Sequence, residues 1–371
     1  MIKTYNEAVD NLFKNEVVRD YTLDKIIEAV CLLWNPEDDF KIIHVAWTNW
    51  KWSVSKMVFS TLKKAWKKVW VFTSPHLIDI RERFETHDWL ISEEEFIEIV
   101  NRVLELEIEL SYFEKCFLIS LLYFQRQKCE YVILETWFWG LLDTTNIVNP
   151  IITAITSIGY DHTDFLWKTL KEISAQKAWI IKQDIPVVIN KHNKVIEDFA
   201  KQKNAPILFT SKKIKTNLIG EYQEKNAAIA YEICKYLDLD EKVILDWLIK
   251  VKHLWRMQFV NENLLVDWAH NINGLKELKK HIDNNFVWKF DNIYYCFWLK
   301  KNKSPELIYK VFWLEKNYIW VDYKSYMLED LSKYKDLKLL NVREIQKLSK
   351  NNKNNLYVVF GSLYMIGEFL K

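Results

Sequence analysis

Residues 40–74, which read FKIIHVAWTNWKWSVSKMVFSTLKKAWKKVWVFTS, decide the fold that this sequence predicts. Two β-rich apolar runs, at 40–46 and 68–74, enclose a helical stretch at 54–65 whose apolar residues recur about every 3.6 positions. A strand, a loop, a helix and a further strand make up a βαβ unit, and such units build parallel sheets. The stretch therefore predicts an α/β domain around a parallel sheet.

The same alternation of β-rich runs and helix-like stretches continues outward from this unit. Up to about residue 252, the β-rich runs lie at 131–135, 151–158 and 185–190, and the helix-like stretches include 92–110 and 222–237. Beyond that point, the β-rich runs lie at 264–268, 292–298 and 355–362, and the helix-like stretches at 272–283 and 304–312. We therefore predict a second, smaller α/β domain, with the boundary near 250–260.

The overall composition is that of a soluble globular protein. Of the 371 residues, 50% are hydrophobic and 27% are charged, and 52 basic side chains balance 50 acidic ones. These values exclude a disordered chain, a collagen-like repeat and a polycation that coats nucleic acid. The five cysteines are scattered, which fits a reducing cytoplasm. Since no segment approaches the roughly 18 apolar residues of a membrane span, we expect a cytoplasmic protein that binds neither nucleic acid nor membrane.

Glycine and tryptophan depart from this ordinary composition. At the usual frequency of about 7%, a chain of this length should carry roughly 26 glycines, yet it has 6, together with 18 tryptophans. Several tryptophans stand in polar or turn-like contexts, where the freedom of glycine at positive φ is useful. They are Trp66, Trp70, Trp89, Trp255 and Trp268. We infer that many of these tryptophans correspond to UGA codons that the source organism reads as glycine and that were translated as tryptophan. The alternative is a genuinely tryptophan-rich protein.

The loop between the first predicted strand and the helix, His44 to Ser53, reads HVAWTNWKWS. With glycine at Trp47, Trp50 and Trp52 it becomes HVAGTNGKGS, the pattern of a phosphate-binding loop. The backbone N–H groups of such a loop wrap phosphate oxygens only where no side chain intervenes, and the lysine and the helix N-terminus supply positive charge. Three indoles would fill that space. A solvated lysine in an ordinary turn is the alternative, and the strand–loop–helix context argues against it.

With this loop in place, the chain resembles the folylpolyglutamate synthase/dihydrofolate synthase family, ATP-dependent ligases related to the Mur ligases. The matching segments include SYFE at 111–114, ETWFWGLLDTTN at 135–146 and SIGYDHT at 157–163, with FTSPHL, WRMQ, DWAHN and GSLYMIGE elsewhere. The tryptophans that stand where this family has glycine are Trp34, Trp47, Trp50, Trp52, Trp137, Trp139, Trp167, Trp179, Trp255, Trp268 and Trp298.

The resemblance implies an α/β fold of two domains. A P-loop, parallel-sheet ATP-binding domain, similar to that of the Mur ligases, is expected at 1–254. A smaller, Rossmann-like α/β ligase domain is expected at 255–371.

The resemblance also implies roles for individual residues. Asn49, Trp50, Lys51, Trp52 and Ser53 match the segment that binds ATP phosphates, and Lys51 is expected to be catalytic. Ser74, Glu135 and His162 match magnesium ligands, and Lys177 matches a lysine that carries a carbamate; His162 and Lys177 are expected to be catalytic as well. Taken alone, Glu135 would be an acidic strand cap, His162 a surface histidine and Lys177 a solvated lysine.

Further residues match the nucleotide-binding and substrate-binding sets of the family. Asn226, Arg256, Asp267 and His270 match residues that contact the nucleotide. Ser111, Tyr112, Phe113, Glu114 and Leu142 match positions that line the pterin site. The family usually has arginine where this chain has Leu141, so one cationic contact is missing.

The function implied is an ATP- and Mg²⁺-dependent ligase that adds L-glutamate to a folate or dihydropteroate carboxylate through an acyl phosphate. The residues leave open which of these acceptors is used. A Mur-type ligase acting on a cell-wall precursor is an alternative, which the SYFE segment disfavours. An inactive binding protein is another, if the tryptophans are real. We expect a monomer whose partners are small-molecule substrates.

Overall fold

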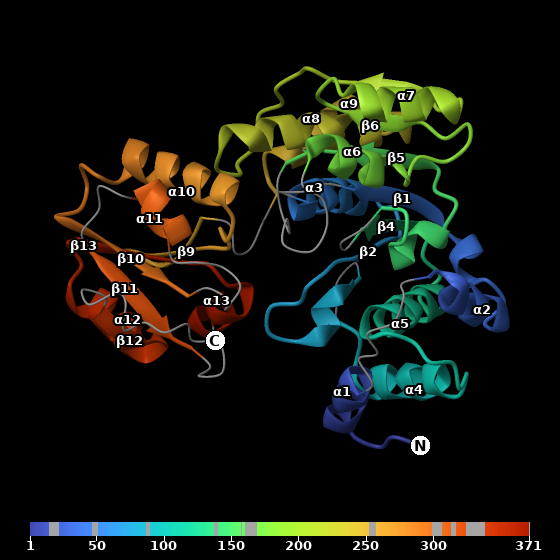
Figure 1. Ribbon diagram of the computed structural model, residues 1–371, viewed down its shortest axis with the longest axis horizontal. Coiled ribbons are helices and arrows are strands. Elements are labelled where there is room, and N and C mark those ends of the chain that lie inside the picture. Colours follow the sequence, from blue (N-terminus) through green and yellow to red (C-terminus); the bar gives the residue numbers. More distant parts are fainter. Residues whose placement is uncertain are drawn as a thin grey trace. The chain divides into compact units, whose positions relative to one another are not determined.

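The computed structural model describes residues 1–14, 22–46, 51–86, 90–136, 140–156, 158–159, 169–251, 257–298, 306–312, 317–323 and 338–370. The chain forms two compact units, Met1–Val251 and Lys252–Lys371 (Figure 1). Among the described residues, no helix combines the length and the apolar character that crossing a membrane requires.

The first unit is built on a seven-stranded sheet in the order β3-β2-β4-β1-β5-β6-β7. β1 lies in the middle of the sheet and pairs in parallel with β4 and β5, whereas β3 runs antiparallel to β2 at one edge. The strands are β1 (Lys41–Ala46), β2 (Val69–Phe72), β3 (Phe84–Glu85), β4 (Tyr131–Glu135), β5 (Ile152–Ile155), β6 (Val187–Ile189) and β7 (Ile207–Phe209). The predicted parallel sheet is confirmed.

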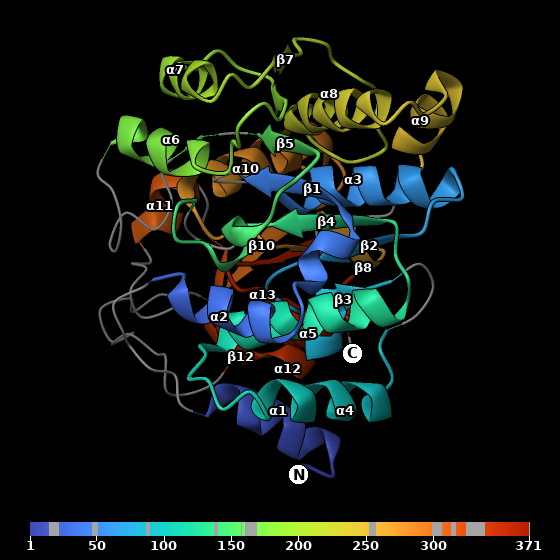
Figure 2. The ribbon, with the colours of Figure 1, turned by 90° about the vertical axis from the view of Figure 1, so that its right-hand side faces the viewer.

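Helices cover both faces of this sheet. α3 packs against β1, β2, β4 and α8, while α5 packs against β2 and carries α4 and α1 on its outer side (Figure 2). The α-helices are α1 (Tyr5–Phe13), α2 (Asp24–Leu32), α3 (Lys51–Lys64), α4 (Glu93–Leu104), α5 (Tyr112–Arg126), α6 (Leu170–Ala178), α7 (Lys194–Gln202), α8 (Glu221–Tyr236) and α9 (Glu241–Leu248). The short 3₁₀ helices are η1 (Pro36–Asp39), η2 (Ile80–Arg83) and η3 (Thr144–Ile147).

The burial of these elements follows from their sequences. β4 reads YVILE and all its residues are buried, as expected for a strand that is covered on both faces. α3 buries Val54, Met57, Val58 and Leu62, the apolar stripe expected from their spacing. α5 is buried from Glu114 through Phe124, because sheet and helices surround it.

The second unit contains a six-stranded sheet in the order β12-β11-β10-β13-β9-β8. The strands from β12 to β9 pair in parallel, and β8 is antiparallel to β9. The strands are β8 (Gln258–Asn261), β9 (Leu264–Asp267), β10 (Asn292–Phe297), β11 (Tyr318–Asp322), β12 (Lys338–Asn341) and β13 (Asn355–Phe360). The helices are α10 (Ile272–Asn285), α11 (Glu306–Phe312), α12 (Val342–Asn351) and α13 (Leu363–Leu370). The expected second α/β fold is therefore present.

Two tryptophans occupy backbone positions that favour glycine. Trp34 follows α2 with φ 67° and Trp66 follows α3 with φ 58°. Hydrogen bonds from Asn35 N to Val30 O (2.8 Å) and from Lys67 N to Leu62 O (3.0 Å) close both helix ends in the Schellman pattern, which places each tryptophan at its left-handed position. Bulky residues are outliers there, and the two indoles are 87% and 90% exposed.

Trp70 corrects the interpretation made for its neighbours. Its neighbours Lys67 and Lys68 suggest a turn-like context, although the β-rich run at 68–74 predicts a strand; Trp70 lies inside β2 and is buried in the apolar core of the first unit. The lysines before it belong to the connection from α3, and the apolar run that begins at Val69 forms the strand. The glycine-like context therefore holds for Trp66 and was wrong for Trp70.

Candidate active site

The carboxyl ends of the central strands bring the predicted phosphate and metal residues to one edge of the first sheet. Val45 of β1 is in register with Glu135 of β4, and Phe72 of β2 with Leu134. Glu135 therefore ends its strand beside the segment that leads to the predicted phosphate loop, and Ser74 follows two residues after Phe72. Open parallel sheets bind their ligands at this edge.

The start of α3 forms one side of this edge. Asn49 and Trp50 lie outside the described residues, and the helix begins at Lys51. The indole of Trp52 is 4% exposed, and its Nε1 donates a hydrogen bond to the Ser74 carbonyl oxygen at 3.1 Å. A bulky side chain thus lies between the first turn of α3 and the Ser74 segment.

Two serine hydroxyls at this edge suit a metal or phosphate ligand. Ser53 and Ser74 are both fully buried, and their Oγ atoms have no hydrogen-bond partner within the described part of the chain. A buried hydroxyl group without a hydrogen-bond partner lowers the stability of the fold unless a ligand binds to it.

Glu135 adds a buried carboxylate to these hydroxyls. Its side chain is fully buried at the end of β4. Hydroxyl and carboxylate oxygens are the donors that Mg²⁺ prefers, so these residues fit the ion. The third predicted ligand, His162, lies outside the described residues. Within the residues that are described, no three His, Cys, Asp or Glu side chains gather as a metal site, so Glu135 would act together with the serine oxygens.

Lys56 is a charged neighbour of this carboxylate that the sequence reasoning did not single out. It lies on α3 and forms an ion pair with Glu85 of β3. Burial lowers the pKa of Lys56 to about 8, while the negative charges of Glu135 and Glu82 act in the opposite direction. From sequence it reads as one of several lysines off the apolar stripe, and only the approach of β3 to α3 gives it a partner.

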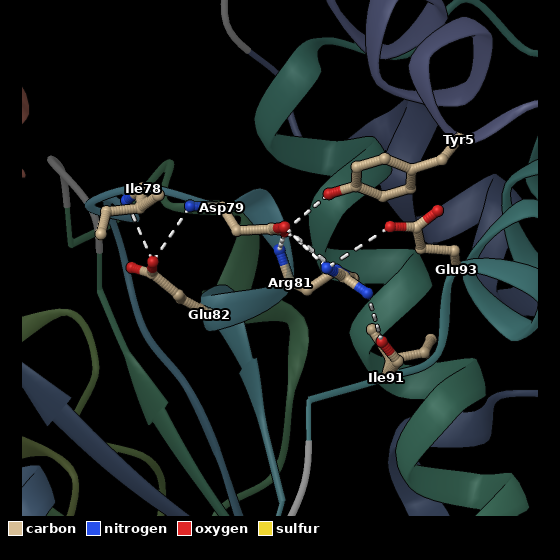
Figure 3. A network of polar contacts seen from close by, with 7 residues as sticks. All are labelled: Tyr5, Ile78, Asp79, Arg81, Glu82, Ile91 and Glu93. Atoms are coloured by element: carbon tan, nitrogen blue, oxygen red, sulfur yellow. Dashed lines mark hydrogen bonds and ion pairs between the residues drawn. The ribbon is translucent and has the colours of Figure 1, made fainter. Parts of the chain in front are cut away.

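A polar network holds the segment that follows Ser74 (Figure 3). The Glu82 carboxylate accepts hydrogen bonds from the backbone N–H groups of Leu77, Ile78 and Asp79, at 2.7 to 3.0 Å. Asp79 in turn accepts a hydrogen bond from the Tyr5 hydroxyl at 2.6 Å and pairs with the Arg81 guanidinium at 2.8 Å. The segment between β2 and β3 is thereby fixed to α1.

The histidine of the SPHL motif is placed by an arginine of the same segment. His76 Nδ1 accepts a hydrogen bond from Arg83 Nε at 3.0 Å. Burial and the Arg83 charge lower the pKa of His76 to about 4, so the ring is neutral at physiological pH. Arg83 also lies over the Tyr112 ring, with 5.3 Å between the guanidinium carbon and the ring centroid.

The SYFE segment forms the first turn of α5. Ser111 Oγ accepts a hydrogen bond from Glu114 N at 3.3 Å, and the Glu114 carboxylate accepts one from Ser111 N at 2.7 Å. This capping box gives Ser111 and Glu114 a structural role that the sequence interpretation did not assign. Tyr112 stacks on Phe13 at 4.5 Å, and Phe113 packs against Phe72 at 5.6 Å, measured between ring centroids.

Lys177 lies on α6 and is buried, with 6% of its surface exposed. The loop that follows β4 approaches this helix very closely at Gly140. A Cβ added to Gly140 would lie 1.6 Å from the Gln176 carbonyl oxygen and 3.2 Å from the Lys177 Cα. Only glycine permits this approach, which places the loop containing Leu142 against the turn of α6 that carries Lys177.

The remaining predicted nucleotide residues are distributed over both units. In the first unit, Asn226 is buried on α8 and donates a hydrogen bond to Gln223 Oε1 at 3.1 Å. In the second, Asp267 ends β9 and accepts hydrogen bonds from Met257 N (3.0 Å) and Ala269 N (2.7 Å). His270 Nδ1 lies 3.0 Å from the Trp268 carbonyl oxygen. Arg256 lies outside the described residues.

Comparisons with known proteins agree on one family. The Mur ligase middle domain family matches residues 48–227. The dihydrofolate synthase/folylpolyglutamate synthase of Bacillus subtilis is 29% identical, over 94% of this chain and 94% of its own. The dihydrofolate synthetase of Saccharomyces cerevisiae is 28% identical, over 71% of this chain and 72% of its own.

Solved structures show the same fold. The folylpolyglutamate synthase of Thermotoga maritima has a TM-score of 0.85 at 24% identity, covering 98% of this chain and 95% of its own. The bifunctional folylpolyglutamate synthase/dihydrofolate synthase of Yersinia pestis, complexed with AMPPNP and a Mn ion, also has a TM-score of 0.85, at 21% identity, covering 99% of this chain and 97% of its own. Residues 48–227 thus match the Mur ligase middle domain, and the proteins to which the chain is similar along most of its length are folylpolyglutamate and dihydrofolate synthases.

Proposed function

We propose that this chain is an ATP-dependent ligase that joins L-glutamate to the carboxylate of a folate or of dihydropteroate. The acceptor carboxylate attacks the γ-phosphate of ATP to give an acyl phosphate and ADP. The amino group of glutamate then attacks the acyl carbon, the amide forms and phosphate leaves. A Mur-type reaction on a cell-wall precursor is not favoured, because the similar proteins are named for folate substrates.

The observation that carries this proposal is the burial of Ser53, Ser74 and Glu135 beside the carboxyl ends of the central strands of the first sheet. These residues would hold Mg²⁺, which supplies positive charge to the phosphates when it is bound. Lys51 stands at the first position of α3, so its charge and the helix N-terminus both act on the phosphoryl group. Catalysis then consists of positioning and charge neutralisation, and it needs no nucleophilic side chain.

The other predicted residues complete the proposed site. Asn226, Arg256, Asp267 and His270 contact the nucleotide, and His162 completes the metal site. Ser111 and Glu114 shape the start of α5, while Tyr112, Phe113 and Leu142 supply apolar surface for the pterin. The protein is proposed to work in the cytoplasm, which its free cysteines support, and to act as a monomer.

Lys177 is proposed to carry a carbamate that helps to hold the metal site. Its burial on α6 supports this, since a buried amine that is partly neutral can add CO₂. A Lys177→Ala variant should then be inactive and recover partly with added short-chain carboxylates. Full activity without such rescue would remove Lys177 from the site.

The proposed function requires glycine at several tryptophan positions. The left-handed backbone at Trp34 and Trp66 supports this, as does the Trp52 indole, which takes up space beside Ser74. We call the full-length chain with glycine at Trp66 and at the tryptophans that match family glycines the glycine form.

The test is glutamate-dependent ADP release by the glycine form with MgATP and either dihydropteroate or tetrahydrofolate. Oxygen-18 in the acceptor carboxylate should appear in the released phosphate, because that oxygen attacks phosphorus and leaves with it. Equal activity of the chain as printed would refute the glycine requirement. Activity with a UDP-linked cell-wall precursor alone would replace the folate assignment by the Mur-type one.

A further inference from the structure

The loop that connects β4 to β5 is held in place from several directions. We call residues 140–146 the Asp143 loop. Within it, Asp143 Oδ1 accepts a hydrogen bond from Thr145 N at 3.0 Å, and Asn146 Nδ2 donates one to the Leu141 carbonyl at 3.1 Å. From outside, Lys182 Nζ donates to the Asn146 carbonyl at 2.7 Å. Gly140 adds the close contact with α6, so the loop has little freedom to move.

A buried histidine joins this loop to the central strand. His44 lies in β1 and is fully buried, and its Nε2 is 2.9 Å from Thr145 Oγ1, although 101 residues separate the two in sequence. Thr145 Oγ1 in turn donates to Asp143 Oδ1 at 2.6 Å. A hydroxyl group has one proton to give, so it must accept from His44. The chain of donors therefore runs from His44 through Thr145 to Asp143, and it requires the tautomer with the proton on Nε2.

Burial keeps the His44 ring in its neutral form. Burial lowers the pKa of His44 to about 3, and the positive charge of Lys182 adds to this effect. The imidazole is therefore neutral near pH 7. What it supplies is one directed hydrogen bond to a buried hydroxyl, which fixes the orientation of Thr145 and Asp143.

We propose that His44 is a positioning residue, which holds the Asp143 loop against β1 and thereby orders the segment that contains Leu142 of the proposed pterin site. β1 ends at Ala46, directly before the predicted phosphate loop, and the Asp143 loop contains Leu142 of the proposed pterin site. The histidine thus links the strand that precedes the predicted phosphate loop to the loop that contains Leu142. The assignment of this loop to the acceptor rests on the proposed function.

The test compares three threonine variants of the glycine form. Thr145→Val removes the hydroxyl that joins His44 to Asp143, Thr145→Ser keeps it, and Thr153→Val is the matched control. Thr153 is also a fully buried threonine, but its hydroxyl donates to the Pro186 carbonyl at 3.1 Å, outside the Asp143 loop. Losing one buried hydrogen bond should raise the KM for the pterin acceptor about tenfold in Thr145→Val. The KM for ATP should change less than about twofold in Thr145→Val. Thr145→Ser, which keeps the hydroxyl group, should have the same KM values as the parent.

Two measurements that need no activity accompany the kinetics. In ¹⁵N-histidine-labelled protein, the ring signal that a His44→Asn variant lacks should show a proton on Nε2 and none on Nδ1. Hydrogen exchange should become faster at the amides of Thr145 and Asn146 in both His44→Asn and Thr145→Val, and it should remain unchanged in Thr153→Val.

These readouts separate the two proposals. An inactive glycine form with the expected exchange pattern would refute the ligase assignment and leave His44 as the residue that orders the loop. An unchanged exchange rate in Thr145→Val, or an acceptor KM that shifts equally in Thr153→Val, would overturn the role of His44. A proton on Nδ1 would overturn the donor chain itself.

Discussion

Replacing Trp34 and Trp66 with glycine should stabilise the chain as printed. Both residues occupy left-handed positions, with φ 67° and φ 58°. A residue with a Cβ in that region costs roughly 1–2 kcal/mol, and glycine avoids this cost. Glycine in turn gives the unfolded chain additional freedom, worth about 0.5–1 kcal/mol. The expected net gain is therefore about 0.5–1 kcal/mol of unfolding free energy at each site.

Little packing is lost in these substitutions, because the two indoles are 87% and 90% exposed. The sites end different helices and share no hydrogen-bond partner in the described residues, so the gains should add to about 1–2 kcal/mol in the double variant. For a unit of this size, such a gain raises Tm by roughly 2–8 °C. Urea and thermal unfolding followed by circular dichroism would measure both quantities without using tryptophan fluorescence.

Trp288→Gly is the matched control. Trp288 is also exposed, at 72%, but its backbone does not have a positive φ. Glycine there brings the entropic cost and removes the contact of Lys289 Nζ with the Trp288 ring, 4.8 Å from its centroid, so this variant should lose about 1–2 kcal/mol. The argument from backbone strain is refuted if Trp34→Gly and Trp66→Gly are no more stable than Trp288→Gly.

Three further outcomes are expected. Gly140→Ala should lose roughly 2–4 kcal/mol of unfolding free energy in a urea titration, because its Cβ would lie 1.6 Å from the Gln176 carbonyl oxygen. Gly274→Ala is the control: the atoms nearest to its Cβ would lie at 3.4 Å, so its unfolding free energy should not change. The pKa of His44 falls to about 3 on folding, so below pH 6.5 the unfolded state binds more protons than the folded state. The contribution of the neutral His44 to the unfolding free energy is therefore largest above pH 6.5 and decreases as the pH falls. Unfolding titrations at pH 6.5 and 4.5 should therefore show a loss that is about 2 kcal/mol larger for the parent than for His44→Asn, and equal losses would contradict the buried neutral ring. In the glycine form, Lys51→Ala should reduce kcat by orders of magnitude with an unchanged circular dichroism spectrum, and a rate within about threefold of the parent would exclude the proposed phosphate contact.

Much of the local structure could be predicted because the signals for it are local. The run YVILE forms β4 over the residues expected, and the described residues of the stretch at 40–74 contain the expected strand β1, helix α3 and strand β2. Continuous apolar runs identify buried parallel strands, and an apolar stripe identifies a helix, without knowledge of what covers them. The phosphate-loop pattern, once glycine replaces tryptophan, is equally local.

Short strands at the edges of the sheets gave no such signal. β3 has two residues, β8 is antiparallel, and β12 at the far edge of the second sheet is mostly exposed. Edge strands have a neighbour on one side and bury little apolar surface, so neither periodicity nor composition distinguishes them from loops. The polar neighbours of Trp70 group it with the tryptophans in turn-like contexts, yet it pairs with Val132 of β4 inside the strand that the run at 68–74 predicts.

The order of residue types along each strand and helix is enough to predict the α/β fold and the strand ends near which Ser74 and Glu135 lie. Only the tertiary structure decided the partners. Lys56 reads as a solvated lysine until β3 brings Glu85 to it, and His44 reads as a structural histidine until Thr145 arrives from 101 residues away. The physical reason is that a hydrogen bond or an ion pair needs its two atoms within about 3 Å, and the chain topology sets that distance between segments that are remote in sequence.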